Sequence, residues 1–258
     1  MKKFELTTES ITNEAGKKLF RIKALIDFGD VKAGELGGYV EKEGNVSQDD
    51  NAWVSGDAEV FGNAKVSGRA LVFGDARVSD NARVSDNAWV FGRALVFGDA
   101  KVSGRALVFG NARVSGDTLI SGNARVSGNA LVFGDAKVSG DAKVSGDAKV
   151  SGNARVSDNA RVSGDALISG NARVSGDAWV SDNADYALVQ GFGIKFRCTT
   201  FYRGKNKKIM VNCGCFHGDL EEFRKQVKET RSGKIAKEYL MIADLMKYHF
   251  ASEDSSDE

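Results

Sequence analysis

A six-residue period dominates the middle of the chain. Valine stands at every sixth position from Val54 to Val180, and only Ile120 and Ile168 depart from it. An alanine precedes each of these positions by two residues, with Thr118 as the one exception. A period this strict predicts one short structural unit that is stacked many times.

The chemistry of the unit, A-x-V-(S/F)-(G/D)-(D/N/R), predicts its shape. Residues two apart in an extended strand point to the same side, so the alanine and valine of each unit share one face. The pair that follows begins with glycine or aspartate, which suits a sharp corner. A short strand and a corner, repeated in phase, give a coil with a narrow interior of Ala and Val.

This unit resembles that of hexapeptide-repeat proteins, in which an aliphatic residue recurs every six positions with a small residue two before it. The resemblance implies a mainly β fold, the left-handed parallel β-helix, which is a triangular prism with three hexapeptides in each 18-residue coil. At ~4.8 Å per coil, the spacing of neighbouring strands, the prism would be roughly 35 Å tall.

Both ends of the chain depart from the repeat, as terminal units do when they cover the ends of a stacked core. Val40 and Val46 begin the repeat, and the two extra residues before Val54 predict a bulge near 48–50. We expect an N-terminal β cap (1–39), the β-helix (40–186), a C-terminal unit of a β-hairpin and two helices (187–251) and a disordered acidic tail (252–258).

Local patterns predict the C-terminal unit. Lys195–Met210 is typical of a hairpin, and Val211–Phe216 is expected to continue its second strand. Asp219 can cap a first helix with Glu222 as its capping-box partner, and a second helix is expected to end at Phe250.

The composition and net charge of the chain limit the classes of protein that it can belong to. Three cysteines, an odd number placed late in the 258 residues, argue against a disulfide framework and favour a reducing compartment. No run approaches the ~20 apolar residues of a membrane span, and the first residues lack a secretory signal. The formal charge of +1 argues against a strongly basic nucleic-acid binder. We expect a cytoplasmic protein that makes no membrane contact.

Outward residues 18 apart should stack into columns, and the face that begins at Trp53 is apolar over half its length. A patch of this size predicts either a partner, most commonly a second copy, or cover by the caps of the chain itself. The predicted protein-binding residues are Trp53, Leu71, Phe73, Trp89, Phe91, Leu107 and Phe109.

The other two faces are less apolar. Bases interrupt the Leu and Phe residues of the second face, and the third face has a column of bases with acids on the same side, which predicts a solvated lattice of salt bridges. The bases are Lys65, Arg83, Lys101, Lys137, Arg155 and Arg173, and the acids are Asp86, Asp99, Asp117, Asp135 and Asp158.

The hairpin contains six bases, no acid and interleaved aromatic residues, a pattern compatible with nucleic-acid binding. A charged, solvated hairpin tip is the more common meaning of such a pattern, and nucleic acid is therefore not the favoured partner. The possible nucleic-acid-binding residues are Lys195, Arg197, Arg203, Lys205, Lys207 and Lys208.

Hexapeptide-repeat proteins are most often acyltransferases, or carbonic anhydrases in another branch, and both use coil histidines as a base or as metal ligands. The histidines here, His217 and His249, both lie outside the coils. The enzymatic inference is therefore not carried over. We expect no enzymatic activity and no cofactor.

Cys213, Cys215 and His217 alternate, so a continuous strand would place them on one face, with Cys198 on the partner strand as a fourth possible zinc ligand. Small, buried cysteines of a core are the more common interpretation. We therefore expect no metal and keep these four residues as a weak alternative.

Three stretches together are similar to uncharacterised phage and prophage proteins: D-F-G-D-V-K-x-G-x-x-G-G-Y-V at Asp27–Val40, the G-N-A-x-V coils, and C-G-C-F-x-G at Cys213–Gly218. The similarity implies a phage-encoded, non-enzymatic protein in the cytoplasm of a bacterial host cell that acts through protein–protein contacts, with inhibition of a host defence protein as one outcome. The alternatives are a homo-oligomeric spacer and a degenerate acyltransferase-like or nucleic-acid-binding protein.

Overall fold

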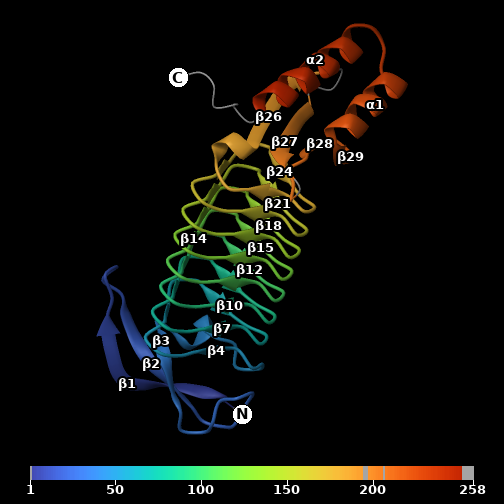
Figure 1. Cartoon of the computed structure of the whole chain (residues 1–258). Coiled ribbons are helices and arrows are strands. Elements are labelled where there is room, and N and C mark those ends of the chain that lie inside the picture. Colours follow the sequence, from blue (N-terminus) through green and yellow to red (C-terminus); the bar gives the residue numbers. More distant parts are fainter. Residues whose placement is uncertain (1, 194–196, 206, 252–258) are drawn as a thin grey trace.

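The computed structural model describes residues 2–193, 197–205 and 207–251. The chain forms a parallel β-solenoid between a β-sheet cap at the N-terminus and a unit of one antiparallel sheet and two helices at the C-terminus (Figure 1). The predicted mainly β, coiled architecture is thereby confirmed.

Each hexapeptide contributes a two-residue strand, and every third strand joins the same sheet. Trp89 pairs in parallel with Leu107, three hexapeptides further along, which confirms the predicted length of a coil. The sheet that we call the first face contains β4 (Trp53–Val54), β7 (Leu71–Val72), β10 (Trp89–Val90), β13 (Leu107–Val108), β16 (Arg125–Val126), β19 (Lys143–Val144), β22 (Arg161–Val162) and β25 (Trp179–Val180).

The other two sheets complete the triangular coil. The second face contains β5 (Glu59–Val60), β8 (Arg77–Val78), β11 (Leu95–Val96), β14 (Arg113–Val114), β17 (Leu131–Val132), β20 (Lys149–Val150) and β23 (Leu167–Ile168). The third face contains β6 (Lys65–Val66), β9 (Arg83–Val84), β12 (Lys101–Val102), β15 (Leu119–Ile120), β18 (Lys137–Val138), β21 (Arg155–Val156) and β24 (Arg173–Val174).

The repeated alanines and valines fill the interior and are almost fully buried. Thr118, which replaces one alanine, is fully buried, and its hydroxyl donates a hydrogen bond of 2.6 Å to the carbonyl oxygen of Ser115. The hydroxyl is therefore tolerated in an apolar interior because it has an acceptor.

The corners require left-handed backbone, which explains the glycine of each unit. Gly128 has a φ of +68°, and a Cβ there would lie 2.8 Å from the amide nitrogen of Gly146 in the next coil. Asp86 takes the same conformation with a φ of 61°, and its carboxylate accepts a 2.9 Å hydrogen bond from the amide of Gly104. Aspartate at a corner thus obtains a bond to the next coil that glycine does not make.

The N-terminal cap consists of β1 (Phe4–Thr12), β2 (Lys18–Ala24) and β3 (Leu36–Val40), and β3 pairs in parallel with β5, so the cap extends the second face. The 3-10 turn η1 (Glu43–Asn45) follows. Val46 bridges Val66 instead of Ala64, which stands three hexapeptides further along, as the predicted two-residue excess requires.

The extra residues near the predicted bulge hold the cap in place. The Lys3 ammonium donates hydrogen bonds of 2.8 Å to the carbonyl oxygens of Asp50 and Ala52, and the Lys3 amide donates to the Gln48 side chain. Lys3 is buried, so burial lowers the pKa of its ammonium to about 8 despite the charge of Asp50.

The C-terminal unit is larger than the predicted hairpin and two helices. After η2 (Asn183–Asp185), it contains a four-stranded sheet and a helical pair that packs on it. Its elements are β26 (Tyr186–Phe192), β27 (Arg197–Arg203), β28 (Ile209–Cys213), β29 (Phe216–Asp219), α1 (Leu220–Thr230) and α2 (Gly233–His249).

The predicted hairpin is present as β27 and β28, and Asp219 and Glu222 form the predicted capping box. The prediction that Val211–Phe216 continues the second strand holds only as far as Cys213, where β28 ends. Gly214 has a φ of +66°, and the chain reverses there so that Cys213 pairs with Phe216 in β29. No helix of the described residues is both long enough and apolar enough to cross a membrane.

Candidate functional site: the first face and the pocket at its end

The N-terminal half of the first face carries a rigid stack of aromatic rings. The rings of Phe73 and Phe91 are parallel within 1° at a centroid distance of 4.8 Å, and those of Phe91 and Phe109 are parallel within 2° at 4.9 Å. Trp89 meets Phe73 edge-on at 6.2 Å. The register of whole coils places each ring above the last, so this stack of rings is already formed without a partner.

The N-terminal cap covers one residue of this face. Trp53 is only 3% exposed because Phe4 and Phe28 pack edge-on against its indole, at centroid distances of 6.2 and 5.3 Å. The structure thus places Trp53 outside the exposed surface, contrary to its expected place among the binding residues, because it forms part of the junction with the cap.

The other six predicted residues remain at the surface. Trp89 is 43% exposed, and the other five are half-buried. The C-terminal unit packs on β24 and β25 at the opposite end of the solenoid. Self-cover, which the sequence left open, therefore extends only to Trp53. We call these six surface residues the apolar strip: Leu71, Phe73, Trp89, Phe91, Leu107 and Phe109.

The C-terminal half of the first face is cationic. Arg125, Lys143 and Arg161 continue the column that Trp53 begins, and serines follow the valines beside them. The column ends at Trp179, which is 46% exposed, and the Arg161 guanidinium lies 5.6 Å from the centroid of the Trp179 indole. One face of the prism thus combines an apolar strip with a row of bases.

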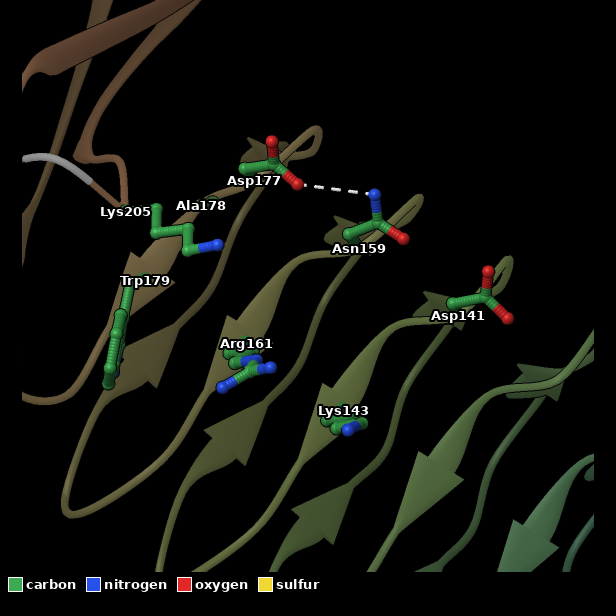
Figure 2. Close-up of a pocket in the computed structure, with 8 residues that line it drawn as sticks. All are labelled: Asp141, Lys143, Asn159, Arg161, Asp177, Ala178, Trp179 and Lys205. Carbon is green, nitrogen blue, oxygen red and sulfur yellow. Dashed lines mark hydrogen bonds between the residues drawn. The ribbon is translucent and has the colours of Figure 1, made fainter.

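A pocket of about 240 Å³ lies at this end, where the hairpin turn meets the solenoid (Figure 2). The Lys205 amide donates a 3.0 Å hydrogen bond to the Asp177 carbonyl oxygen, and Gly204 bridges Ala178, so the turn is fixed beside the coil. The pocket is lined by Asp141, Lys143, Asn159, Arg161, Asp177, Ala178, Trp179 and Lys205.

The carboxylates of the pocket take part in a ladder along the adjacent corner. Asn159 donates a 3.2 Å hydrogen bond to Asp177 (Figure 2). Asn123 donates one of 2.8 Å to Asp141. In the described part of the chain, none of the three bases that line the pocket forms an ion pair within 4.0 Å. Three bases and two carboxylates therefore line the pocket, and none of the three bases is paired with a carboxylate.

The third face lacks the predicted lattice of salt bridges, and that prediction is wrong. None of its six bases forms an ion pair among the described residues, because the acids lie at the corners rather than on the flat sheet. Asp158, for example, accepts a 3.1 Å hydrogen bond from the amide of Gly176 in the next coil. The Arg173 guanidinium donates to the carbonyl oxygen of Gly214.

The bases of the hairpin serve different purposes and do not form one patch. Arg203 pairs with Asp185 at 3.0 Å and donates a 2.7 Å hydrogen bond to the carbonyl oxygen of Phe250, and Lys208 pairs with Asp219 at 3.2 Å. Lys205 lines the pocket and Lys207 is exposed. Lys195 and the side chain of Arg197 lie outside the described residues.

The structure separates the weak zinc candidates. The turn after Cys213 places Cys215 outside the strand, and Thr199 rather than Cys198 lies opposite Cys213. Nδ1 of His217 is 2.9 Å from the side-chain oxygen of Asn212. In the described ranges, no three His, Cys, Asp or Glu side chains are grouped to hold a metal ion.

The chain is a β-solenoid repeat protein. Its coils are built from stacked parallel strands of two residues, an interior of Ala and Val, and corner residues with positive φ. The chain matches the family model described as the YdcK beta solenoid repeat at residues 76–92, 119–134, 124–140, 148–164, 154–170 and 166–182, all within the solenoid. No curated protein matches the chain.

Proposed function

We propose that the protein is a non-enzymatic binding protein whose first face docks on another protein. The observation that carries this proposal is the apolar strip, a preformed stack that includes the 43% exposed Trp89 and that neither end unit covers. Exposed apolar patches of this kind mark interaction surfaces in soluble proteins, and aromatic side chains are enriched in the centres of such interfaces.

The charge pattern of the first face indicates the chemistry of the partner. An apolar surface beside acidic side chains would match the strip and the bases Arg125, Lys143 and Arg161 together. A second copy of the chain offers no such match over the whole face. Parallel packing brings the two sets of bases together, and antiparallel packing places them on the apolar strips, whose strand positions carry no acid.

We therefore take the partner to be a different protein. The similarity to phage and prophage proteins supports a host protein in the bacterial cytoplasm, and inhibition of a defence protein would be one result of such binding. As in hexapeptide-repeat proteins, we take the coils to wind left-handed.

Matched phenylalanines test this proposal. Phe109 and Phe133 both occupy A-L-V-F-G units, but Phe109 belongs to the apolar strip and Phe133, 42% exposed, lies on the second face. After capture of the partner from bacterial lysate and its purification, Trp89→Arg and Phe109→Ser should each weaken the measured affinity about tenfold or more, as loss of an interface anchor does. Phe133→Ser should leave the affinity unchanged.

The oligomeric state separates this proposal from a homo-oligomeric spacer. Light scattering should show a monomer for the wild type. A wild-type dimer that dissociates in Trp89→Arg would contradict a different protein as the partner and would favour self-association. Equal effects of Phe109→Ser and Phe133→Ser on the affinity would exclude the first face as the docking surface.

A further inference from the structure

The pocket at the end of the first face differs from its counterpart at the other end. Trp53 and Trp179 are the first and last residues of one column, and the N-terminal cap buries Trp53. The C-terminal unit contacts the residue before Trp179, because Gly204 bridges Ala178, yet it leaves Trp179 46% exposed. The junction therefore leaves an aromatic ring exposed at the pocket.

The charges around this ring favour an anion. Lys143 and Arg161 reach the pocket from consecutive coils, and Lys205 reaches it from the hairpin turn (Figure 2). The rim carboxylates of Asp141 and Asp177 already accept hydrogen bonds from asparagines along the corner. The three bases outnumber the two carboxylates, and an anion with several oxygens would give them the ion pair that the described residues do not supply.

We propose that this pocket binds a mononucleotide, with its phosphate among Lys143, Arg161 and Lys205 and its base against Trp179. Arginine and lysine donors match phosphate oxygens. A base can stack on the part of the exposed indole that the Arg161 guanidinium, 5.6 Å from the ring centroid, leaves open. The volume of about 240 Å³ is below the ~300–1,000 Å³ of sites for drug-sized ligands, which favours one nucleotide over a dinucleotide.

The chain contains its own controls for this proposal. Lys137, Lys143 and Lys149 occupy three consecutive, identical D-A-K-V-S-G hexapeptides, so they lie at equivalent positions on the third, first and second faces. All three are exposed, and only Lys143 lines the pocket. Replacement of each by alanine removes the same charge from the same local sequence, and only the place on the prism differs.

Calorimetric titration of the full chain with AMP, adenosine, ribose 5-phosphate and inorganic phosphate tests the proposal. AMP should bind, and the other three should bind about tenfold or more weakly, because each lacks the base or the phosphate. Lys143→Ala and Lys205→Ala should weaken AMP binding about tenfold, as expected when a charged hydrogen-bond donor is lost. Lys137→Ala and Lys149→Ala should change it less than about twofold, as screened surface charges do.

Other outcomes would overturn the proposal in identifiable ways. Equal losses in the three lysine variants would show a diffuse effect of net charge, and inorganic phosphate as tight as AMP would exclude a role for the base. Tighter binding of a short oligonucleotide than of AMP would identify a polymer as the ligand, and no binding of AMP would exclude the site. Thermal melting that is unchanged in the variants confirms that each is folded. The titration uses the protein without its protein partner. Because Lys143 and Arg161 also belong to the cationic half of the first face, binding of the protein partner is tested separately at Trp89 and Phe109.

Discussion

Trp53 and Trp89 stand in one column of the first face, each paired with Leu71, yet Trp53 is 3% exposed and Trp89 43%. The difference comes from Phe4 and Phe28, which enclose the first indole and do not reach the second. Trp53 is therefore a core residue and Trp89 a surface residue, although they occupy equivalent positions of the repeat.

Substitutions at these two tryptophans should differ in their effect on stability. Trp53→Ala opens a cavity under the cap and should lower the free energy of unfolding by ~3–5 kcal/mol. Trp89→Ala should lower it by ~1 kcal/mol or less, because the ring is largely at the surface. Urea unfolding followed by circular dichroism measures both, and equal losses would contradict the role of the cap.

The corner glycines should be more sensitive than glycines elsewhere. In Gly128→Ala the residue keeps a φ near +68° and its Cβ meets the backbone of Gly146, so we expect a loss of ~1–3 kcal/mol. Gly44→Ala is the control, since nothing lies within 4 Å of a Cβ there and its φ is not positive. Thermal unfolding should show a lower midpoint only for Gly128→Ala, and a normal midpoint would refute the strain at the corner.

Stability should depend on pH through Lys3. Burial lowers the pKa of its ammonium from 10.5 to about 8, so between these values the unfolded chain binds more protons than the folded chain. Stability therefore rises with pH in this window. Relative to Lys3→Met, which cannot titrate, the wild type should gain about 2 kcal/mol of unfolding free energy between pH 7.5 and 10, from ~1.4 kcal/mol per pKa unit. Parallel pH profiles of the two proteins would contradict the lowered pKa.

The Arg203 side chain should anchor α2 to the sheet. It pairs with Asp185 and donates to the carbonyl oxygen of Phe250, so Arg203→Ala leaves two acceptors without their donor and should cost ~1–3 kcal/mol. The exposed Lys207 is the matched control on the same hairpin, and Lys207→Ala should be neutral. Hydrogen exchange at α2 should accelerate in Arg203→Ala alone, and unchanged protection would exclude the anchor.

Most of the solenoid could be predicted because one rule repeats. Valine at every sixth position determines both the strand and the pairing, so Trp89 had to lie beside Leu107 once a coil of three hexapeptides was assumed. The left-handed sense of the coil stays a prediction. The turn at Gly214 was missed because C-G-C-F alternates like a strand, and only the left-handed φ of the glycine reverses the chain there.

The sites were less predictable because they depend on contacts between distant segments. The cover over Trp53 comes from Phe4 and Phe28, and neither lies in the repeat. Lys205 was assigned to a basic hairpin, whereas the bridge between Gly204 and Ala178 places it beside Trp179. The column that contains Lys143, Arg161 and Trp179 was visible in the sequence, but its meaning depended on where the hairpin docks.

Because each coil contains three hexapeptides, the number of hexapeptides in the tract determines on which side of the prism the residues after it lie. Removal or duplication of one hexapeptide would turn everything after it by a third of a revolution, so the pocket beside Trp179 would leave the side of the prism that carries Trp89. A change of three hexapeptides would keep both on one side and alter only their separation, by ~4.8 Å. Natural length variants should therefore differ by whole coils wherever one ligand has to span both features.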